Sequence, residues 1–208
     1  MLHEFRQISI GELQHIFNQH AIWLETGFSN GARADLSGAD LNSIDLSCCD
    51  LRRIDFSGAD MRGAILNDAD LRDSDLRAAH LTRAKLQNAD LRRADLWRAK
   101  VWESDLRSAN LDRALLSEAV MYNANLSNAC LTGADLWCAD LRKVHFADAD
   151  LSNHKETDKH TILTGAKLYG IEKTGWNISG VLCEYAYWDK LGEMKTDYES
   201  GMFEKEFA

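Results

Sequence analysis

The 208-residue chain predicts an all-β solenoid, in which the backbone coils around a narrow apolar interior. Two observations support this prediction: a five-residue period runs unbroken from 34 to 153, and no straight element can bury it. Apolar residues five apart would scatter around an α-helix, which turns about 100° per residue. On a flat strand they would alternate between the two faces. The chain must therefore turn a corner once in every unit.

The five-residue units share one pattern of side chains. An apolar residue stands at the centre of 24 consecutive units, at every fifth position from Leu36 to Leu151. The centre is Leu in 19 units, Ala stands two positions before it in 18, and Asp stands one position before it in 14. We predict that Ala and Leu point inward and that Asp points outward. The corner should lie two positions after the centre, where Gly, Asn, Asp and Ser recur.

These A-D-L-x-x units, which begin as ADLSG-ADLNS at Ala34, resemble the pentapeptide repeat family over about 120 residues. The resemblance implies a right-handed quadrilateral β-helix with four units per coil. The 24 units of 32–153 would then form about six coils. Both ends of such a rod would expose unpaired backbone groups, and we therefore expect caps.

The segment 1–31 is expected to be a helical cap. Ser9 and Glu12 match a capping box, an apolar helix follows over about 10–25, and Gly27 ends it. A partner-binding helix is the alternative. The segment also resembles the N-terminal flanks of some family members.

The segment 154–208 is expected to be a C-terminal extension that caps the other end. Leu163 and Leu168 lie five apart and predict one partial coil. A β-hairpin with its turn at Ser179-Gly180 is predicted from Trp176, Ile178, Val181, Tyr185, Tyr187 and Trp188, and an acidic tail follows. A separate small interaction module is the alternative for this region.

Composition narrows the class of partner. The formal net charge is −9, from 24 basic and 33 acidic residues, which argues against nucleic-acid or anionic-membrane binding. No apolar run approaches the roughly 20 residues of a membrane span. The N-terminal residues lack the apolar core of a signal peptide, and five cysteines fit reduced thiols, so we expect a cytoplasmic protein.

Motifs of catalysis are missing from the sequence. It contains no phosphate-binding glycine loop, no G-x-S-x-G and no H-E-x-x-H. Asp recurs with the repeat, which is typical of a solvated face rather than of paired catalytic carboxylates. His154 and His160 share the interruption of the repeat, and zinc binding there is a minor alternative. We expect no enzymatic activity, cofactor, metal or small-molecule substrate.

The expected site is a protein-interaction surface. With four units per coil, residues 20 apart are stacked, and six large apolar residues then gather at outward positions of two adjacent faces. This aromatic surface consists of Trp97, Trp102, Leu115, Val120, Tyr122 and Trp137. Exposed apolar groups of this kind mark interfaces, so we expect a protein partner or self-association as a homodimer. The alternative is that the C-terminal segment folds back over it.

A second stripe combines opposite charges. The arginine ladder stacks Arg52, Arg72 and Arg92 beside Asp50, Asp70 and Asp90. A surface of ion pairs with small net energy is expected, and contact with an acidic partner is the alternative.

The expected function is a non-enzymatic interaction scaffold with an unspecified partner. The resemblance also implies an alternative, in which an acidic rod mimics DNA and modulates DNA gyrase or another type II topoisomerase. The repeat region holds 20 acidic and 16 basic residues, a weak charge for a DNA mimic.

Overall fold

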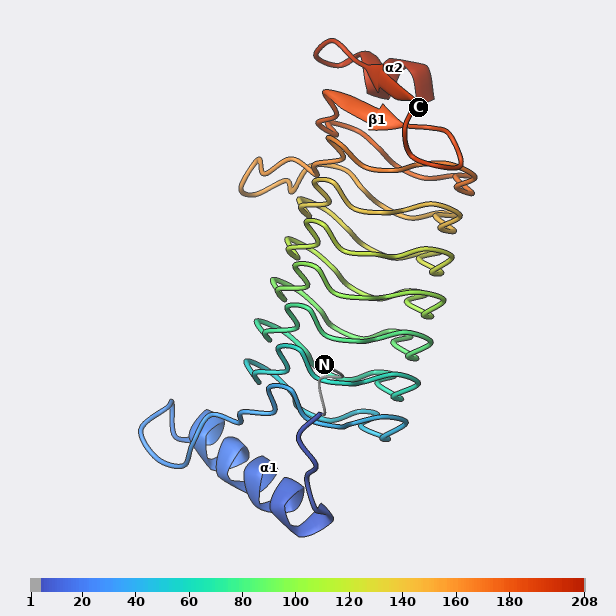
Figure 1. Cartoon of the computed structure of the whole chain (residues 1–208). Coiled ribbons are helices and arrows are strands. Elements are labelled where there is room, and N and C mark those ends of the chain that lie inside the picture. The colour runs from blue at the N-terminus through green and yellow to red at the C-terminus, as the bar shows by residue number, and fades with distance from the viewer. Residues whose placement is uncertain (1–4, 208) are drawn as a thin grey trace.

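The molecule is an elongated stack of coils with a helix at one end and a small mixed module at the other (Figure 1). This computed structural model describes residues 5–207. Helix α1 (Ile10–Glu25) lies at the N-terminal end of the stack. Strands β1 (Tyr185–Tyr187) and β2 (Lys195–Asp197) and helix α2 (Met202–Phe207) lie at the C-terminal end.

Parallel pairing between residues 20 apart builds the stack. Asp35 bridges Asp55, which bridges Asp75, and the same step recurs on every side of the coil. The Leu36 amide donates to the Asp55 carbonyl at 2.7 Å, and the Asp55 amide donates to the Ala34 carbonyl at 3.1 Å. Four units therefore make one coil, and the chain forms a β-helical solenoid.

Each coil has four faces, which we number by their first central residue. Face 1 begins at Leu36, face 2 at Leu41, face 3 at Leu46 and face 4 at Leu51. Every face contributes one bridging residue per coil, so the pairing consists of isolated bridges rather than long strands.

The corners lie two residues after each centre, as predicted. The Ala39 amide donates to the Leu36 carbonyl at 3.1 Å and closes a four-residue turn. Gly38 has φ of 61° in this turn, and Ser43 takes the same place in the next unit with φ of 56°. Positive φ at the third residue is the requirement of a type II turn.

The recurrent Asp has a structural role of its own. The carboxylate of Asp35 accepts the Ser37 amide at 2.9 Å, an Asx turn that orients the unit before its corner. Asp75, Asp95 and Asp135 make the same bond to the amide two residues later. The preference for Asp before the centre therefore follows from backbone satisfaction.

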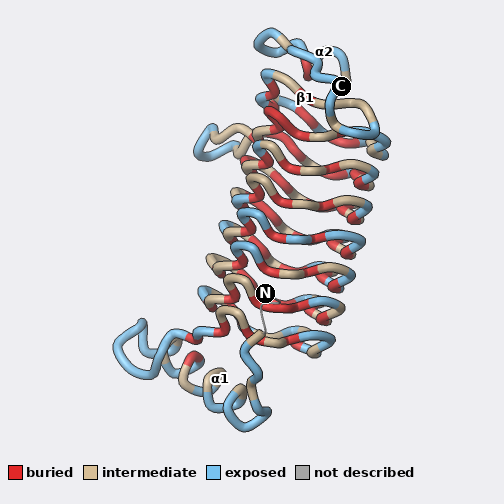
Figure 2. The backbone as a smooth tube through the Cα atoms, viewed as in Figure 1, coloured by how far each residue is buried: buried red, intermediate tan, exposed pale blue. Residues whose placement is uncertain are grey.

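The interior is the continuous apolar column that the repeat predicts (Figure 2). Leu91 and Ala89 have no exposed surface, and the same holds for nearly all central and Ala positions of the repeat. Burial of this column is the main stabilising contribution.

Helix α1 lies against the first coil. Ser9 accepts the Glu12 amide at 3.2 Å, which confirms the predicted start of the helix. The His20 ring, 1% exposed, accepts the Ala34 amide at Nδ1 (3.1 Å) and donates from Nε2 to the Arg52 carbonyl (2.8 Å). Burial lowers the pKa of His20 below its ordinary value. Before the helix, the Arg6 amide donates to the Gly38 carbonyl at 2.7 Å.

The coiling resumes after an insertion. Asp135 bridges Ile162, 27 residues on instead of 20, because the loop of 153–159 projects from the stack. Leu163 and Leu168 then return to the interior, where the sequence predicted a partial coil. The parallel pairing continues to Tyr187, which bridges Lys167.

The predicted hairpin at Ser179-Gly180 is wrong. Gly180 has φ of 74° and forms a corner between two units of the last coil. Trp176 and Ile178 before this corner, and Val181 and Cys183 after it, point into that coil, where all four are buried. The only hairpin in the described part of the chain is later, where β1 and β2 pair antiparallel.

An aromatic cluster lies on the last coil. Phe203 of α2 is 1% exposed and packs near Trp188 and Tyr198, with ring centroids 6.3 and 5.2 Å away. Lys173 stands at a central position of the repeat, and its ammonium lies 4.1 Å from the Phe207 ring centroid.

Candidate protein-interaction surface

The structure brings the aromatic surface together on faces 1 and 2, where the sequence placed it. On face 1, Leu115 bridges Asp95 below and Asp135 above. On face 2, Val120 bridges Lys100, and the Glu103 amide donates to the Tyr122 carbonyl at 3.0 Å. Tyr122 therefore lies one coil above Trp102, while Trp137 lies two coils above Trp97.

Four of these six side chains are widely exposed. The exposed fractions are 46% for Trp102, 43% for Trp137, 39% for Leu115 and 37% for Trp97. Val120 and Tyr122 are half-buried. Large rings held on a hydrogen-bonded coil lose little further freedom on binding, which favours them as anchors.

Cationic groups cover part of two rings. The Arg98 guanidinium lies 4.2 Å from the Trp97 ring centroid and donates to the Glu118 carboxylate at 2.7 Å. The Lys143 ammonium lies 5.4 Å from the Tyr122 ring centroid. Such cation–π contacts favour the observed positions of the two rings, of which Trp97 stays 37% exposed.

The surface extends further than the sequence indicated. Ile162 bridges both Asp135 and Leu182, so these residues continue the outward column of Leu115. Leu182 is 44% exposed and Tyr169, on face 2, is 38% exposed. The insertion hid this extension, although counting units from Leu163 and Leu168 would have assigned Ile162 the outward place.

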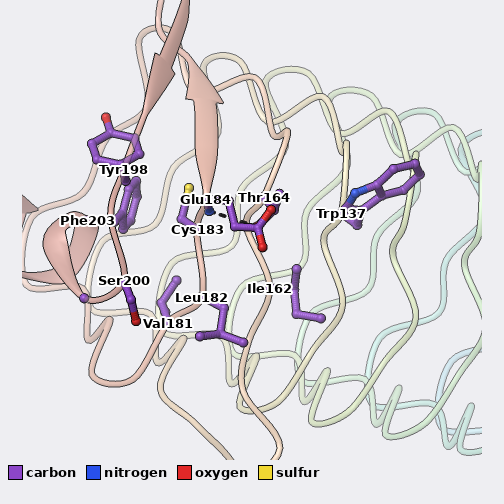
Figure 3. Close-up of a pocket in the computed structure, with 11 residues that line it drawn as sticks. Trp137, Ile162, Thr164, Val181, Leu182, Cys183, Glu184, Tyr198, Ser200 and Phe203 are labelled. Carbon is purple, nitrogen blue, oxygen red and sulfur yellow. Dashed lines mark hydrogen bonds between the residues drawn. The ribbon is translucent and has the colours of Figure 1, made fainter.

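Beside Trp137 lies a depression that we call the C-terminal hollow (Figure 3). It has a volume of about 490 Å³. Its lining residues are Trp137, Ile162, Thr164, Val181, Leu182, Cys183, Glu184, Tyr198, Ser200, Gly201 and Phe203. The C-terminal segment thus forms one wall of the hollow and leaves Trp137 exposed, instead of folding over the aromatic surface.

The arginine ladder on face 4 consists of ion pairs. Arg72 donates to Asp70 from Nε at 2.8 Å, and its Nε lies 3.5 Å from the carboxylate of Asp90 in the next coil. Hydrogen bonding to Asp70 raises the pKa of Arg72. Burial raises the pKa of Asp90, but hydrogen bonds from Arg92 outweigh it and leave that pKa below its ordinary value. The ladder ends at Arg92, because Asn110 follows Asp90 in the stack.

The residues considered for zinc have separate partners. His154 accepts the Thr157 amide at 3.2 Å and lies 3.6 Å from Asp112, whereas His160 contacts the Gly180 carbonyl at 2.8 Å. Across residues 5–207, no three His, Cys, Asp or Glu side chains are grouped to hold a metal. All five cysteines are free thiols, and burial raises the pKa of Cys183 to about 12. No helix within that range is long and apolar enough to span a membrane.

Comparisons with known proteins agree with the repeat. The family model for pentapeptide repeats matches in eight copies, over residues 34–73, 66–98, 103–137 and 131–155. No curated protein sequence matches the chain.

Three solved structures illustrate the similarity. HetL, a pentapeptide repeat protein involved in heterocyst differentiation regulation in the cyanobacterium Nostoc sp. strain PCC 7120, is 25% identical, with 90% of this chain and 99% of HetL covered and a TM-score of 0.41. A pentapeptide repeat protein of the Arabidopsis thaliana thylakoid lumen is 30% identical. The match covers 54% of this chain and 65% of that protein, with a TM-score of 0.33. QnrB1, a plasmid-mediated fluoroquinolone resistance protein, is 19% identical. The match covers 72% of this chain and 79% of QnrB1, with a TM-score of 0.39.

Proposed function

Because the chain belongs to the pentapeptide repeat family, we propose that it is a non-enzymatic interaction scaffold that presents its aromatic surface to a protein partner. The scaffold is a rigid, right-handed quadrilateral rod capped at both ends. The exposure of Trp97, Trp102, Leu115 and Trp137 on two adjacent faces supports this proposal above all. A cytoplasmic location is part of it and is supported by the five free thiols.

The local chemistry of Leu115 and Val120 supports an interface. Asp95 and Asp135 occupy the equivalent place in the coils below and above Leu115, and each accepts an amide at 3.0 Å. A Leu or Val side chain has no acceptor, so the unit loses that bond and exposes apolar surface to water. Neither change improves the packing of the coil. Burial against a partner would offset both costs.

The residue types also match those that dominate binding energies. Trp and Tyr are enriched among the few interface residues whose truncation is costly, and such residues cluster. The parallel coils hold them on hydrogen-bonded backbone rather than on a loop. A preformed surface of this kind suits association with a folded protein.

The double variant Trp102→Ser/Tyr122→Ser tests the proposal. We expect at least a tenfold loss of partner affinity, or loss of the heavier particle if the partner is a second copy. Light scattering and photo-crosslinking in cells provide the readouts. Gln87→Ser/Arg107→Ser is the matched control, since it changes the same outward places on face 3. Unchanged mass and unchanged crosslinking in the double variant would refute the proposal.

DNA-mimicking modulation of gyrase or another type II topoisomerase is the second candidate. The net charge of −9 on a rod favours it. Against it, the carboxylates of Asp50, Asp70 and Asp90 are paired with arginines, so face 4 has no continuous acidic stripe. A supercoiling assay with and without a quinolone tests this candidate: inhibition or protection at stoichiometric protein would establish it, and no effect would exclude it.

A further inference from the structure

The C-terminal hollow is apolar at its base. Leu182 and Ile162 are outward residues of face 1, and Phe203 and Val181, which also line the hollow, are buried (Figure 3). Leu182 remains 44% exposed, although most large apolar side chains of the last coil are covered. The volume of about 490 Å³ lies within the range of about 300–1,000 Å³ that is usual for ligand pockets.

A single charged residue lines the hollow. The Glu184 side chain lies beside Thr164 in Figure 3, and the backbone amide of Glu184 donates to the Thr164 hydroxyl oxygen at 3.0 Å. Asp135 bridges Ile162 on the same face but does not line the hollow, and its carboxylate accepts the Trp137 amide at 3.0 Å. Neither carboxylate forms an ion pair within residues 5–207. The nearby Lys195 is already paired with Asp197 at 2.5 Å.

From this combination we infer that the hollow binds a segment of a protein partner in which one bulky apolar side chain stands beside lysine or arginine. The apolar side chain would pack on Leu182 and Ile162, and the neighbouring cation would pair with Glu184. The inference rests on the proposed function, because it names the chemistry of the partner. Trp137 lines the hollow and belongs to the aromatic surface, so both regions form one continuous contact area.

Charge complementarity decides between kinds of occupant. Glu184 is exposed, and its carboxylate attracts cations and repels phosphate and carboxylate ligands through water, an interaction that salt screens. The hollow therefore selects against nucleic acid and against acidic peptides. The apolar base selects against purely polar basic peptides.

Three fluorescein-labelled peptides test this inference by anisotropy with the full chain. The first is Gly-Lys-Leu-Phe-Lys-Gly, the second replaces both lysines with glutamate, and the third replaces Leu-Phe with Gly-Gly. We expect the first to bind in the micromolar to millimolar range and at least tenfold more tightly than either of the others. Raising the salt concentration should weaken its binding.

Two variants make the test specific. Glu184→Lys should reverse the preference, so that the glutamate peptide binds more tightly than the lysine peptide. Leu182→Ser should weaken the lysine peptide at least fivefold. Ile65→Ser and Glu172→Lys are matched controls at outward positions of face 3 and should leave binding unchanged. Circular dichroism establishes that every variant keeps its coils.

Three outcomes would overturn the inference. They are equal binding of the lysine and glutamate peptides, insensitivity to Glu184→Lys, and a concentration-dependent dimer that Leu182→Ser dissolves while no peptide binds. If the peptides fail but Trp102→Ser/Tyr122→Ser still abolishes partner binding, only this inference falls. If the lysine peptide binds but that double variant keeps its partner, the aromatic surface is refuted instead.

Discussion

The lower and upper halves of the stack share one interior and differ in their outer surface. Below residue 95, five outward aspartates are paired with the arginine two residues later, as in Arg77–Asp75 at 2.5 Å, whereas above it Asp105 and Asp140 alone form this pair within residues 5–207. Above it, exposed positions carry Trp97, Trp102 and Leu182. The backbone bridges repeat with the same step in both halves. The inward positions and the Asx-turn aspartates therefore specify the fold, and the remaining outward positions can vary with function.

Replacement of an inward residue should cause the largest loss of stability, because both halves of the stack share the same interior. Leu91→Asp places a carboxylate without a partner at a position with no exposed surface, and we expect a loss of more than about 4 kcal/mol of unfolding free energy. Urea denaturation followed by circular dichroism measures it. The neighbouring outward change Arg92→Ala is the control and should cost less than about 1 kcal/mol. A wild-type-like melt of Leu91→Asp would mean that the interior does not hold the coils.

Removal of the aromatic cap should affect one end only. Phe203→Ala deletes a buried ring, which typically costs about 3–5 kcal/mol, and solenoid stability is carried by contacts between neighbouring coils. Hydrogen exchange should therefore accelerate over 163–207 and remain slow over 54–131. Uniform acceleration along the stack, or none, would show that α2 does not stabilise the last coil.

Acid should weaken the N-terminal end through His20. Its folded pKa lies below the unfolded value, so the neutral ring stabilises the fold above about pH 6.5, and this contribution is lost as the pH falls toward the lowered pKa. Protonation at Nδ1 would also break the bond from the Ala34 amide. The difference in melting temperature between wild type and His20→Gln should shrink from pH 7.5 to pH 5. A constant difference over that range would contradict the assignment.

Single outward changes in the two halves should separate stability from binding. Arg72→Ala removes partly exposed ion pairs and should cost between 0 and about 1 kcal/mol. Trp102→Ser should also change stability by less than about 1 kcal/mol, yet reduce partner affinity. Thermal melts and crosslinking yields measure the two effects. Loss of binding in Arg72→Ala alone would move the interface to face 4.

The amino-acid sequence predicted the coil, its corners and the first helix. The period of five predicted the coil, the Gly and Asn positions predicted the corners, and Ser9 predicted the start of α1. The hairpin was misplaced because apolar residues lie on both sides of Ser179-Gly180, and two units of a coil joined by a glycine corner show the same pattern as two paired strands.

Of the candidate site, the sequence predicted the aromatic surface but not the C-terminal hollow. The aromatic surface follows from stacking residues 20 apart, which is a property of the repeat. The C-terminal hollow depends on Tyr198 and Phe203 lining the same depression as Trp137, which precedes them in the chain by the whole insertion and the last coil. No sequence period encodes it, because the seven extra residues shift the register and the tail leaves the repeat, pairing β2 antiparallel with β1 instead of adding another parallel coil.

Site-specific photo-crosslinking tests the central claim most directly. A benzoylphenylalanine placed at Trp102 samples the aromatic surface, and the same group at Gln87 or Arg72 samples equivalent outward places on faces 3 and 4. We predict a discrete crosslinked species in cells from position 102 and none from 87 or 72. Equal crosslinking at all three positions, or crosslinking from position 72 alone, would contradict the assignment of the aromatic surface as the interface.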